Sequence, residues 1–490
     1  MNTQDDAPGR LAAGDVRERA AGGAALLGAR GLLIYAFGIA ANIVLARLLA
    51  PRDFGIFALG MVVVVAGMLF SEGGFGGALI KRREPPLRAE LEAVQALQLA
   101  VAVSVAAATA VAPITLGRDV ELMALMAASL PIAILRAPTM LVLERELEYR
   151  LIATADLVEA LVFYGAAIGL VAAGLGVWGM ALAVVLRAAA GSATLVARGP
   201  LGLVAPRWST SEIRPLAGFG AKLQAASLVT VTREQLVNVG VGVVAGLGTL
   251  GVWSLAWRVM QVPALLFLTV GRVAFPTMSR LLAVERDPGP VLERQVAAVA
   301  VVNAILVVGL VGFAAALPEL VGHRWDDVPT VLLWSGVALV ISSAVVVSAA
   351  GYLLAAGLPG TLAVATGLAG IVWLGVALPL LDPLGAAAVG VGWVVSGVVN
   401  AVVLWRPVAA RTSARIAPAM ALPTAVSLAA VGAAWWVAHL PDDRFVGGLL
   451  GLAAGELVLF AGLLAFSRPA LREVEALARQ GLQSLGRAQP

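Results

Sequence analysis

The sequence has 490 residues, of which 60% are hydrophobic and only 13% are charged. A soluble protein of this length needs far more polar surface, so the composition excludes a soluble globular protein and indicates a polytopic membrane protein. The chain contains no cysteine, which excludes disulfides, thiol catalysis and thiolate metal sites. The arginines behind the net charge of +4 stand at the ends of apolar segments, a pattern typical of membrane topology rather than of nucleic-acid binding.

Apolar segments long enough to cross a bilayer follow one another along most of the chain. We therefore expect an all-α polytopic membrane protein with about 14 transmembrane helices. The expected spans are residues 24–49, 54–80, 91–116, 120–143, 151–174, 177–197, 216–246, 249–276, 295–317, 328–356, 360–381, 384–405, 419–440 and 445–467. An even number of spans places both termini on the same side of the membrane.

Basic residues are unevenly distributed between the loops on the two sides of these spans. Clusters such as Lys81, Arg82 and Arg83 fall on the side of the N-terminus, whereas the opposite turns contain few basic residues, such as Arg52 and Arg324. Because lysine and arginine accumulate on the cytoplasmic side, this bias predicts that both termini are cytoplasmic. The first apolar stretch is too long for the core of a signal peptide, so we expect no cleavable signal.

The most informative stretch covers residues 45–83. Two apolar segments meet there at a tight turn of Pro51, Arg52 and Asp53, and the second segment carries Glu72 within a glycine-rich run. A carboxylate at this depth of a bilayer is costly, so an intramembrane glutamate is a candidate functional residue. The stretch therefore points to transport across the membrane.

Two short stretches indicate an internal repeat. Residues 53–59 (DFGIFAL) and residues 249–255 (TLGVWSL) each occupy an outside turn that leads into a span. This offset aligns the first span with the seventh and the second with the eighth, in the same orientation. The two halves are therefore expected to be related by an axis along the membrane normal, with a shared site between them near the midplane.

Four segments resemble a known family. They are ARLLAPRDFGIFAL at residues 46–59, FSEGGFGGALIKRR at 70–83, LGVWSLAWRVMQVP at 250–263 and GRVAFPTMSRL at 271–281. They resemble the Wzx-like oligosaccharide flippases, which are the polysaccharide transporters of the multidrug/oligosaccharidyl-lipid/polysaccharide (MOP) exporter superfamily. With the span count and the repeat, the resemblance covers most of the chain.

The resemblance implies two pseudo-symmetric six-helix lobes across a central cavity, followed by two further helices. It implies that a lipid-linked oligosaccharide on undecaprenyl pyrophosphate is flipped from the cytoplasmic to the outer leaflet of the bacterial inner membrane, by ion-coupled alternating access. The expected parts are a cytoplasmic N-terminal segment (1–23), an N-lobe (24–198), a cytoplasmic loop (199–214), a C-lobe (215–405), two further spans (406–467) and a cytoplasmic amphipathic tail (468–490).

Basic residues within the spans suggest what such a cavity would bind. A diphosphate and its sugars need a wet, cationic site, and arginine matches phosphate oxygens with its fork of donors. The candidate substrate-binding residues are Arg30, Lys222, Arg233, Arg258 and Arg272. Arg30 and Arg272 have an alternative interpretation, because both lie close enough to a membrane face to reach the lipid headgroups.

Other intramembrane charges suggest structural ion pairs within the N-lobe. Arg136 and Arg187 are expected to pair with acids there. Asp156 and Glu159 lie three residues apart on one helix face, so they are the natural partners.

Glu72 and Glu234 are the candidates for coupling transport to an ion. A carboxylate inside the membrane can carry a proton or a cation, whereas the two histidines, His323 and His439, fall in outside turns. The alternative is that each glutamate only neutralises a neighbouring arginine. We expect no cofactor and no structural metal; a proton or Na⁺ is the expected coupling ion.

Three other functions remain open at this point. A multidrug exporter and a peptidoglycan-precursor (lipid II) flippase share the superfamily. The many intramembrane arginines disfavour the drug exporter, and the four segments resemble the polysaccharide branch more than the lipid II flippases. A membrane glycan polymerase or glycosyltransferase is disfavoured because the outside turns are too short for a sugar site, so we expect no enzyme. The expected partners are the lipid-linked oligosaccharide, the bilayer, and a glycan polymerase with export machinery, with no nucleic acid; we expect a monomer.

Overall fold

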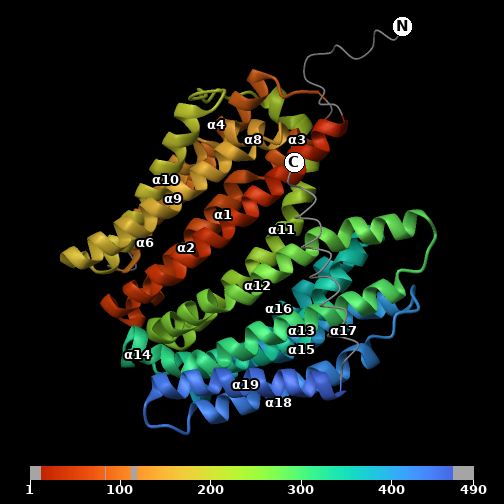
Figure 1. Ribbon diagram of the computed structural model, residues 1–490. Coiled ribbons are helices and arrows are strands. Elements are labelled where there is room, and N and C mark those ends of the chain that lie inside the picture. Colours follow the sequence, from red (N-terminus) through yellow and green to blue (C-terminus); the bar gives the residue numbers. More distant parts are fainter. Residues whose placement is uncertain (1–12, 83, 112–118, 467–490) are drawn as a thin grey trace, which may run out of the picture. The chain divides into compact units, whose positions relative to one another are not determined.

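The computed structural model describes residues 13–82, 84–111 and 119–466. These residues form helices with no strand among them, which confirms the expected all-α class (Figure 1). The α-helices are α1 (Ala13–Leu48), α2 (Pro51–Glu72), α3 (Phe75–Lys81), α4 (Arg88–Val111), α6 (Asp119–Ala127), α7 (Ser129–Ile134), α8 (Ala137–Arg145), α9 (Tyr149–Leu170), α10 (Val177–Arg198), α11 (Thr210–Val244), α12 (Gly246–Ala283), α13 (Gly289–Phe313), α14 (Leu317–Val321), α15 (Val328–Ala355), α16 (Pro359–Leu384), α17 (Ala387–Ala409), α18 (Ile416–Ala438) and α19 (Arg444–Phe466). Short irregular helices are η1 (Val171–Leu175), η2 (Ala314–Ala316) and η3 (His323–Trp325).

Every expected span overlaps a helix, or a series of helices separated by breaks. Within the described residues, ten helices are long and apolar enough to cross a membrane, and there are up to eleven if the bent pair Val120–Ile134 and Ala137–Arg145 is one span. The class of multi-pass membrane protein is therefore confirmed, whereas the count of fourteen crossings is not. The expected amphipathic tail at 468–490 lies outside the described residues.

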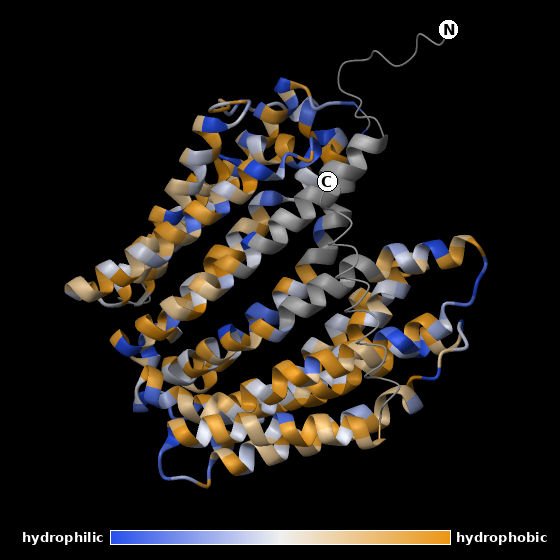
Figure 2. Cartoon of the chain, viewed as in Figure 1, coloured by the Kyte–Doolittle hydropathy of each residue, from blue (hydrophilic) through white to orange (hydrophobic). Residues whose placement is uncertain are grey.

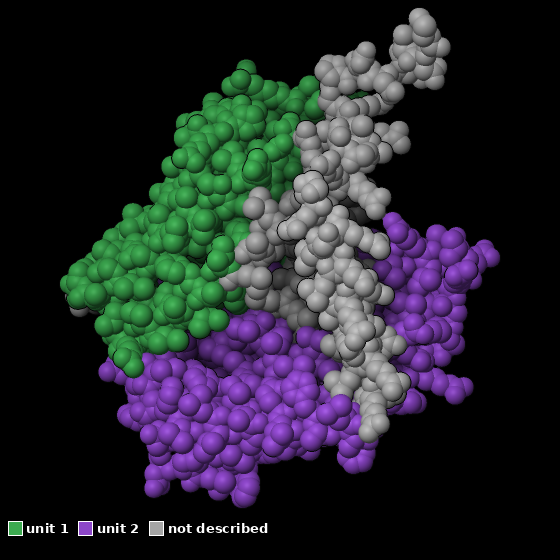
Figure 3. Space-filling model, viewed as in Figure 1, with its two compact units in different colours: residues 1–49, 59–228 green, residues 50–58, 229–490 purple. Residues whose placement is uncertain are grey.

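The chain divides into two compact units (Figure 3). Unit 1 comprises residues 1–49 and 59–228, and unit 2 comprises residues 50–58 and 229–490. In both units the helices are mostly apolar along their length, and hydrophilic residues gather toward helix ends and connections (Figure 2). This distribution is the one expected for helices whose middles lie in hydrocarbon.

Carboxylates at the third helical position fix the starts of α2 and α4. Asp53 accepts a hydrogen bond from the N–H of Ala50 (2.8 Å), and Glu90 accepts one from the N–H of Leu87 (2.8 Å). Each bond is half of a capping box and satisfies a backbone donor that the helix leaves free. The turn expected at residues 51–53 is thus the first turn of α2, with Pro51 at its first position.

The first turns of α2 and α12 touch backbone to backbone within unit 2. A methyl group on Gly55 would lie 1.9 Å from the carbonyl oxygen of Leu247, and one on Gly251 would lie 1.7 Å from that of Pro51. The contacts are reciprocal. Gly55 faces the carbonyl of Leu247, four residues before Gly251, and Gly251 faces the carbonyl of Pro51, four residues before Gly55. Gly55 and Gly251 hold the same position in the two copies of the predicted repeat, so these copies meet in a pseudo-twofold contact.

Asp287 joins the connection between α12 and α13 to the connection between α17 and α18. Its carboxylate accepts hydrogen bonds from the N–H groups of Gly289 (2.9 Å) and Ser413 (3.3 Å), and from the Ser413 hydroxyl. Glu293 accepts another from the N–H of Arg415. The Ser413 hydroxyl, followed by the backbone N–H of Gly289, lowers the pKa of Asp287 below its ordinary value.

Gly251→Ala should lower the thermal unfolding temperature of the purified protein, because its new methyl group has no room against the Pro51 carbonyl. Gly248→Ala, on the same helix, is the matched control, since nothing lies within 4 Å of the added group. Its helix propensity should leave stability equal or slightly raised. Equal unfolding temperatures for the two variants would contradict the close contact.

Asp287→Asn should also lower the unfolding temperature at neutral pH. Because folding lowers the pKa of Asp287, its contribution is present above the unfolded-state pKa of about 3.9 and is lost as the pH falls through the folded-state pKa. The difference between wild type and variant should therefore shrink on acidification below about pH 4. A difference that stays constant over that range would show that Asp287 acts through shape rather than charge.

Candidate functional site

A break between α2 and α3 lies next to the intramembrane glutamate Glu72. Gly73 and Gly74 have φ angles of 54° and 71°, a left-handed conformation that glycine adopts without strain. The break deprives nearby backbone carbonyls of their helical donors. The side-chain amide of Gln98 donates to the carbonyl of Glu72 (3.3 Å). That of Gln224 donates to the carbonyl of Leu69, which also accepts from the N–H of Gly73 (3.4 Å).

A second break separates α7 from α8, and the helical segments on its two sides differ in direction by 49°. Pro138 stands at the start of α8, and its lack of an N–H leaves the carbonyl of Ile134 without its helical donor. The side-chain amide of Gln95 donates to this carbonyl (3.1 Å), and the hydroxyl of Ser192 donates to the carbonyl of Ile132 (2.7 Å). Both breaks are therefore stabilised by polar side chains from neighbouring helices.

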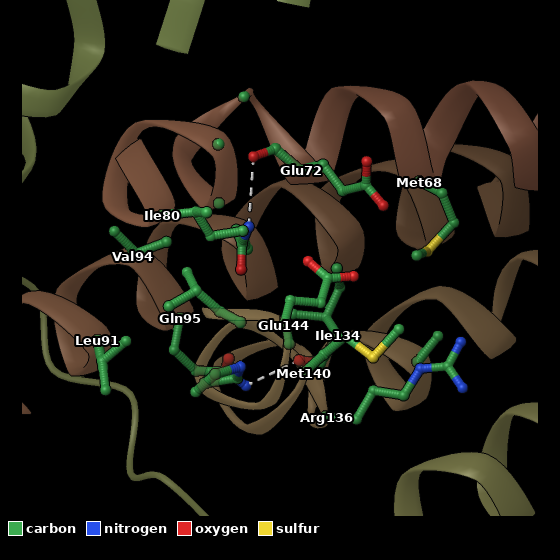
Figure 4. A pocket seen from close by; sticks show the side chains of 18 of the residues that line it. Met68, Glu72, Ile80, Leu91, Val94, Gln95, Ile134, Arg136, Met140 and Glu144 are labelled. Atoms are coloured by element: carbon green, nitrogen blue, oxygen red, sulfur yellow. Dashed lines mark hydrogen bonds between the residues drawn. The ribbon is translucent and has the colours of Figure 1, made fainter. Parts of the chain in front are cut away.

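The two breaks border one cavity of about 350 Å³ in unit 1 (Figure 4). Its charged lining residues are Glu72, Arg136 and Glu144, and Gln95 and Gln98 of α4 also line it. The remaining lining residues are mostly apolar or small: Met68, Gly74, Gly76, Gly77, Ile80, Leu91, Val94, Ala133, Ile134, Ala137, Pro138, Met140, Leu141 and Gln224. A cavity of this size with a few converging polar groups is typical of a small-molecule or ion site.

Glu159 of α9 holds two arginines. Its carboxylate forms ion pairs with Arg136, which stands at the second break, and with Arg187 of α10 (3.1 Å). The side chain of Glu159 is only 5% exposed, so the paired arginines offset the cost of burying its charge. Gly191 makes room for this network, because a methyl group there would lie 2.0 Å from a Glu159 oxygen.

Asp156 does not join this network. It forms an ion pair with Arg30 of α1, and the two side chains are 28% and 26% exposed. The sequence placed Arg30 among the substrate-binding candidates and Asp156 among the acids for Arg136 and Arg187. The structure instead gives Arg30 a carboxylate partner on α9 and assigns both of the other arginines to Glu159.

Arg233 of α11 lies against aromatic residues in unit 2. Its guanidinium carbon is 5.7 Å from the ring centre of Trp373, and its stem packs on Gly370. Glu234 is a distant partner, at 3.5 Å, and the Nε of Arg233 has no hydrogen-bond partner among the described residues. The ring of Trp373 belongs to a cluster of tryptophans, namely Trp253, Trp257, Trp373 and Trp393.

Arg258 of α12 also lies over aromatic rings. Its guanidinium carbon is 5.5 Å from the ring centre of Phe54 and 5.4 Å from that of Phe57. Both phenylalanines are buried in unit 2. The side chains of Lys222 and Arg272, the other two candidates, lie outside the part of the chain that the structure describes.

Three cavity residues were not among the candidates from the sequence. Glu144 directly follows the expected span 120–143, and charged residues are common at the ends of membrane spans. The bend between α7 and α8 brings Glu144 to the cavity. Gln95 and Gln98 lie one turn apart on α4, and this spacing is a signal that the sequence carries. Their partners are backbone carbonyls at two distant breaks, which the sequence does not reveal.

The chain matches the family described as "Polysaccharide biosynthesis protein" over residues 44–330, more than half of its 490 residues. The chain belongs to this polysaccharide biosynthesis family. The four segments that resemble the oligosaccharide flippases all lie within the matched residues, so the family resemblance is confirmed. No curated protein matches the sequence.

Solved structures show which fold this family member adopts. It is similar to the lipid II flippase MurJ in an inward closed conformation, with a TM-score of 0.74 and 12% identity over 90% of this chain and 98% of MurJ. A multidrug resistance MATE family transporter of the MOP superfamily, in an inward-facing conformation, has a TM-score of 0.58 and 17% identity over 78% of this chain and 94% of that chain. At these identities the similarity establishes the MOP fold alone.

Glu159→Gln should lower the unfolding temperature and the amount of protein in the membrane, because it removes the charge that both Arg136 and Arg187 contact. Glu146→Gln is the control, since Glu146 is exposed and outside this network. Fluorescence-detected size-exclusion chromatography after heating measures both quantities. If Glu159→Gln behaves like the control, the three-residue network does not stabilise unit 1.

Proposed function

We propose that this member of the polysaccharide biosynthesis family is a flippase that moves an undecaprenyl-pyrophosphate-linked oligosaccharide from the cytoplasmic to the outer leaflet, for polysaccharide export. The observation that carries the proposal is the family match over residues 44–330, which includes the flippase-like segments. The fold shared with MurJ supports transport of a lipid-linked substrate, because MurJ is a lipid II flippase. We place the protein in the bacterial inner membrane with both termini cytoplasmic, on the bias of its basic residues.

The arginines of unit 2 are the groups that we propose to bind the diphosphate. Arg233 and Arg258 lie over aromatic rings, and such stacking occupies the face of a guanidinium group. The donors of a guanidinium lie in its plane, so a stacked arginine is oriented while its edge can bind phosphate oxygens. Arg30 is a weaker candidate than the sequence suggested, because it already contacts Asp156.

Drug export is the second candidate function, and the tryptophan cluster beside Arg233 is the observation that favours it. Aromatic rings suit flat, apolar drugs when their faces line a binding site. Trp253 and Trp373 are only 2% exposed, and their indole N–H groups donate to Asn238 and to the carbonyl of Val389. These two rings pack inside unit 2, so the cluster supports drug export less than its size suggests.

Arg233→Ala should reduce glycan export in cells at unchanged membrane levels of the protein. Loss of one charge-assisted contact to a phosphate predicts a decrease of roughly tenfold or more, with lipid-linked oligosaccharide accumulating on the cytoplasmic leaflet. Arg233→Lys keeps the charge but not the planar fork, so it should be impaired to a smaller extent. Arg324→Ala, an exposed change in an outside turn, is the control.

Normal export by Arg233→Ala at wild-type protein levels would remove Arg233 from the site. If drug efflux falls in this variant while glycan export does not, the drug exporter is the better interpretation.

A further inference from the structure

Glu72 and Glu144 are acids of the unit 1 cavity that lack basic partners. Both line the cavity, and neither carboxylate forms an ion pair or a hydrogen bond within the described residues (Figure 4). Arg136 lines the same cavity, but it is paired with Glu159. Arg145, which follows Glu144, donates instead to the carbonyls of Leu79 and Arg82, both at 2.8 Å. Two carboxylates without an ion-pair partner are costly inside a membrane.

The charges around the cavity leave room for one more positive charge. Among the side chains that the structure describes, the three carboxylates of Glu72, Glu144 and Glu159 stand with the two guanidinium groups of Arg136 and Arg187. This cluster therefore has one negative charge in excess. A single monovalent cation neutralises it, whereas a divalent cation leaves an excess of positive charge.

Gln95 supplies a third oxygen and an observation independent of the acids. Its side chain is fully buried at 0% exposure, and it lines the cavity. The amide nitrogen donates to the carbonyl of Ile134, which fixes the orientation of the group, but the amide oxygen has no hydrogen-bond partner. A buried, unpartnered acceptor that lines the same cavity as two carboxylates adds a third oxygen of the kind that a hard cation binds.

The helix breaks add to the negative potential of the cavity. The C-terminal end of α2 is Glu72, and the C-terminal end of the segment Val120–Ile134 is at the second break. Helix C-termini carry a partial negative charge, which favours cations. Interrupted membrane helices use such ends to bind coupling cations.

We propose that the cavity of unit 1 binds one monovalent cation of the size of Na⁺, with the carboxylates of Glu72 and Glu144 and the amide oxygen of Gln95 as its ligands. The inference rests on the proposed transport function, for which it identifies the coupling site. In this proposal Glu144 takes the place of Glu234 as the second candidate for ion coupling, because Glu234 of unit 2 is paired with Arg233.

The position of the ligands suggests how the cation acts on the protein. Glu72 ends α2 on one side of the first break, whereas Glu144 lies on α8, beyond the second break. The segments beyond the breaks, α3 and α8, are tied together by the bonds from Arg145 to the carbonyls at the end of α3. A cation shared by Glu72 and Glu144 therefore joins α2 to the paired segments, and its release frees them to bend.

Binding of ²²Na⁺ to the purified full-length protein tests the proposal without any glycan. We expect saturable binding of one Na⁺ per chain at constant ionic strength in choline chloride. Glu72→Gln, Glu144→Gln and Gln95→Leu should each weaken it roughly tenfold or more. Glu456→Gln is the matched control, because Glu456 is an intramembrane acid of unit 2. Glu144→Asp, which keeps the charge, should retain binding with altered affinity and guards against misfolding as the cause.

Absence of saturable Na⁺ binding in the wild type would overturn the proposal, and so would equal binding by Glu144→Gln and Glu456→Gln. Uptake of a proton on acid titration by the wild type but not by Glu144→Gln, without Na⁺ binding, would assign the excess charge to a shared proton and would also overturn it. These outcomes do not depend on flipping. A protein that binds Na⁺ but does not export glycan would contradict the proposed function alone.

Discussion

A helix that breaks inside a membrane leaves backbone carbonyls without donors, and the architecture of unit 1 depends on how this constraint is met. Two glutamines of α4, one turn apart, each donate to a carbonyl at a different break: Gln98 to Glu72 and Gln95 to Ile134. Because water is absent from the hydrocarbon region, these side-chain donors supply the hydrogen bonds that the broken helices lose. The breaks in turn bring Glu72, Arg136 and Glu144 to one cavity, which two unbroken helices would not do.

Unit 2 holds its intramembrane charges in another way. In unit 1, Arg30, Arg136 and Arg187 form ion pairs with carboxylates of α9, whereas Arg233 and Arg258 of unit 2 rest on the faces of Trp373, Phe54 and Phe57. Aromatic faces attract a cation without neutralising it. The difference between the two units supports our division of roles, with cation binding in unit 1 and diphosphate binding by the arginines of unit 2.

Most of the fold is predictable from the sequence because apolar length and charge bias determine where membrane helices lie. The repeat was also visible, and the reciprocal contact of Gly55 with Gly251 gives it a structural basis. The candidate site was less accessible. A break at Gly73 and Gly74 or at Pro138 depends on which donors lie nearby, and these come from distant helices. The pairing of Arg30 with Asp156 likewise depends on helix packing, not on spacing within one helix.

The central claim is that this fold and these charges move a lipid-linked oligosaccharide between leaflets. The most direct measurement uses proteoliposomes of the purified protein with undecaprenyl-pyrophosphate-linked oligosaccharide whose sugar carries a fluorophore. A membrane-impermeant reductant then reports how much label faces outward over time. Our account predicts that label initially on the inner leaflet becomes accessible in vesicles with the wild-type protein, and much more slowly with Arg233→Ala. Accessibility no greater than in protein-free vesicles would contradict it.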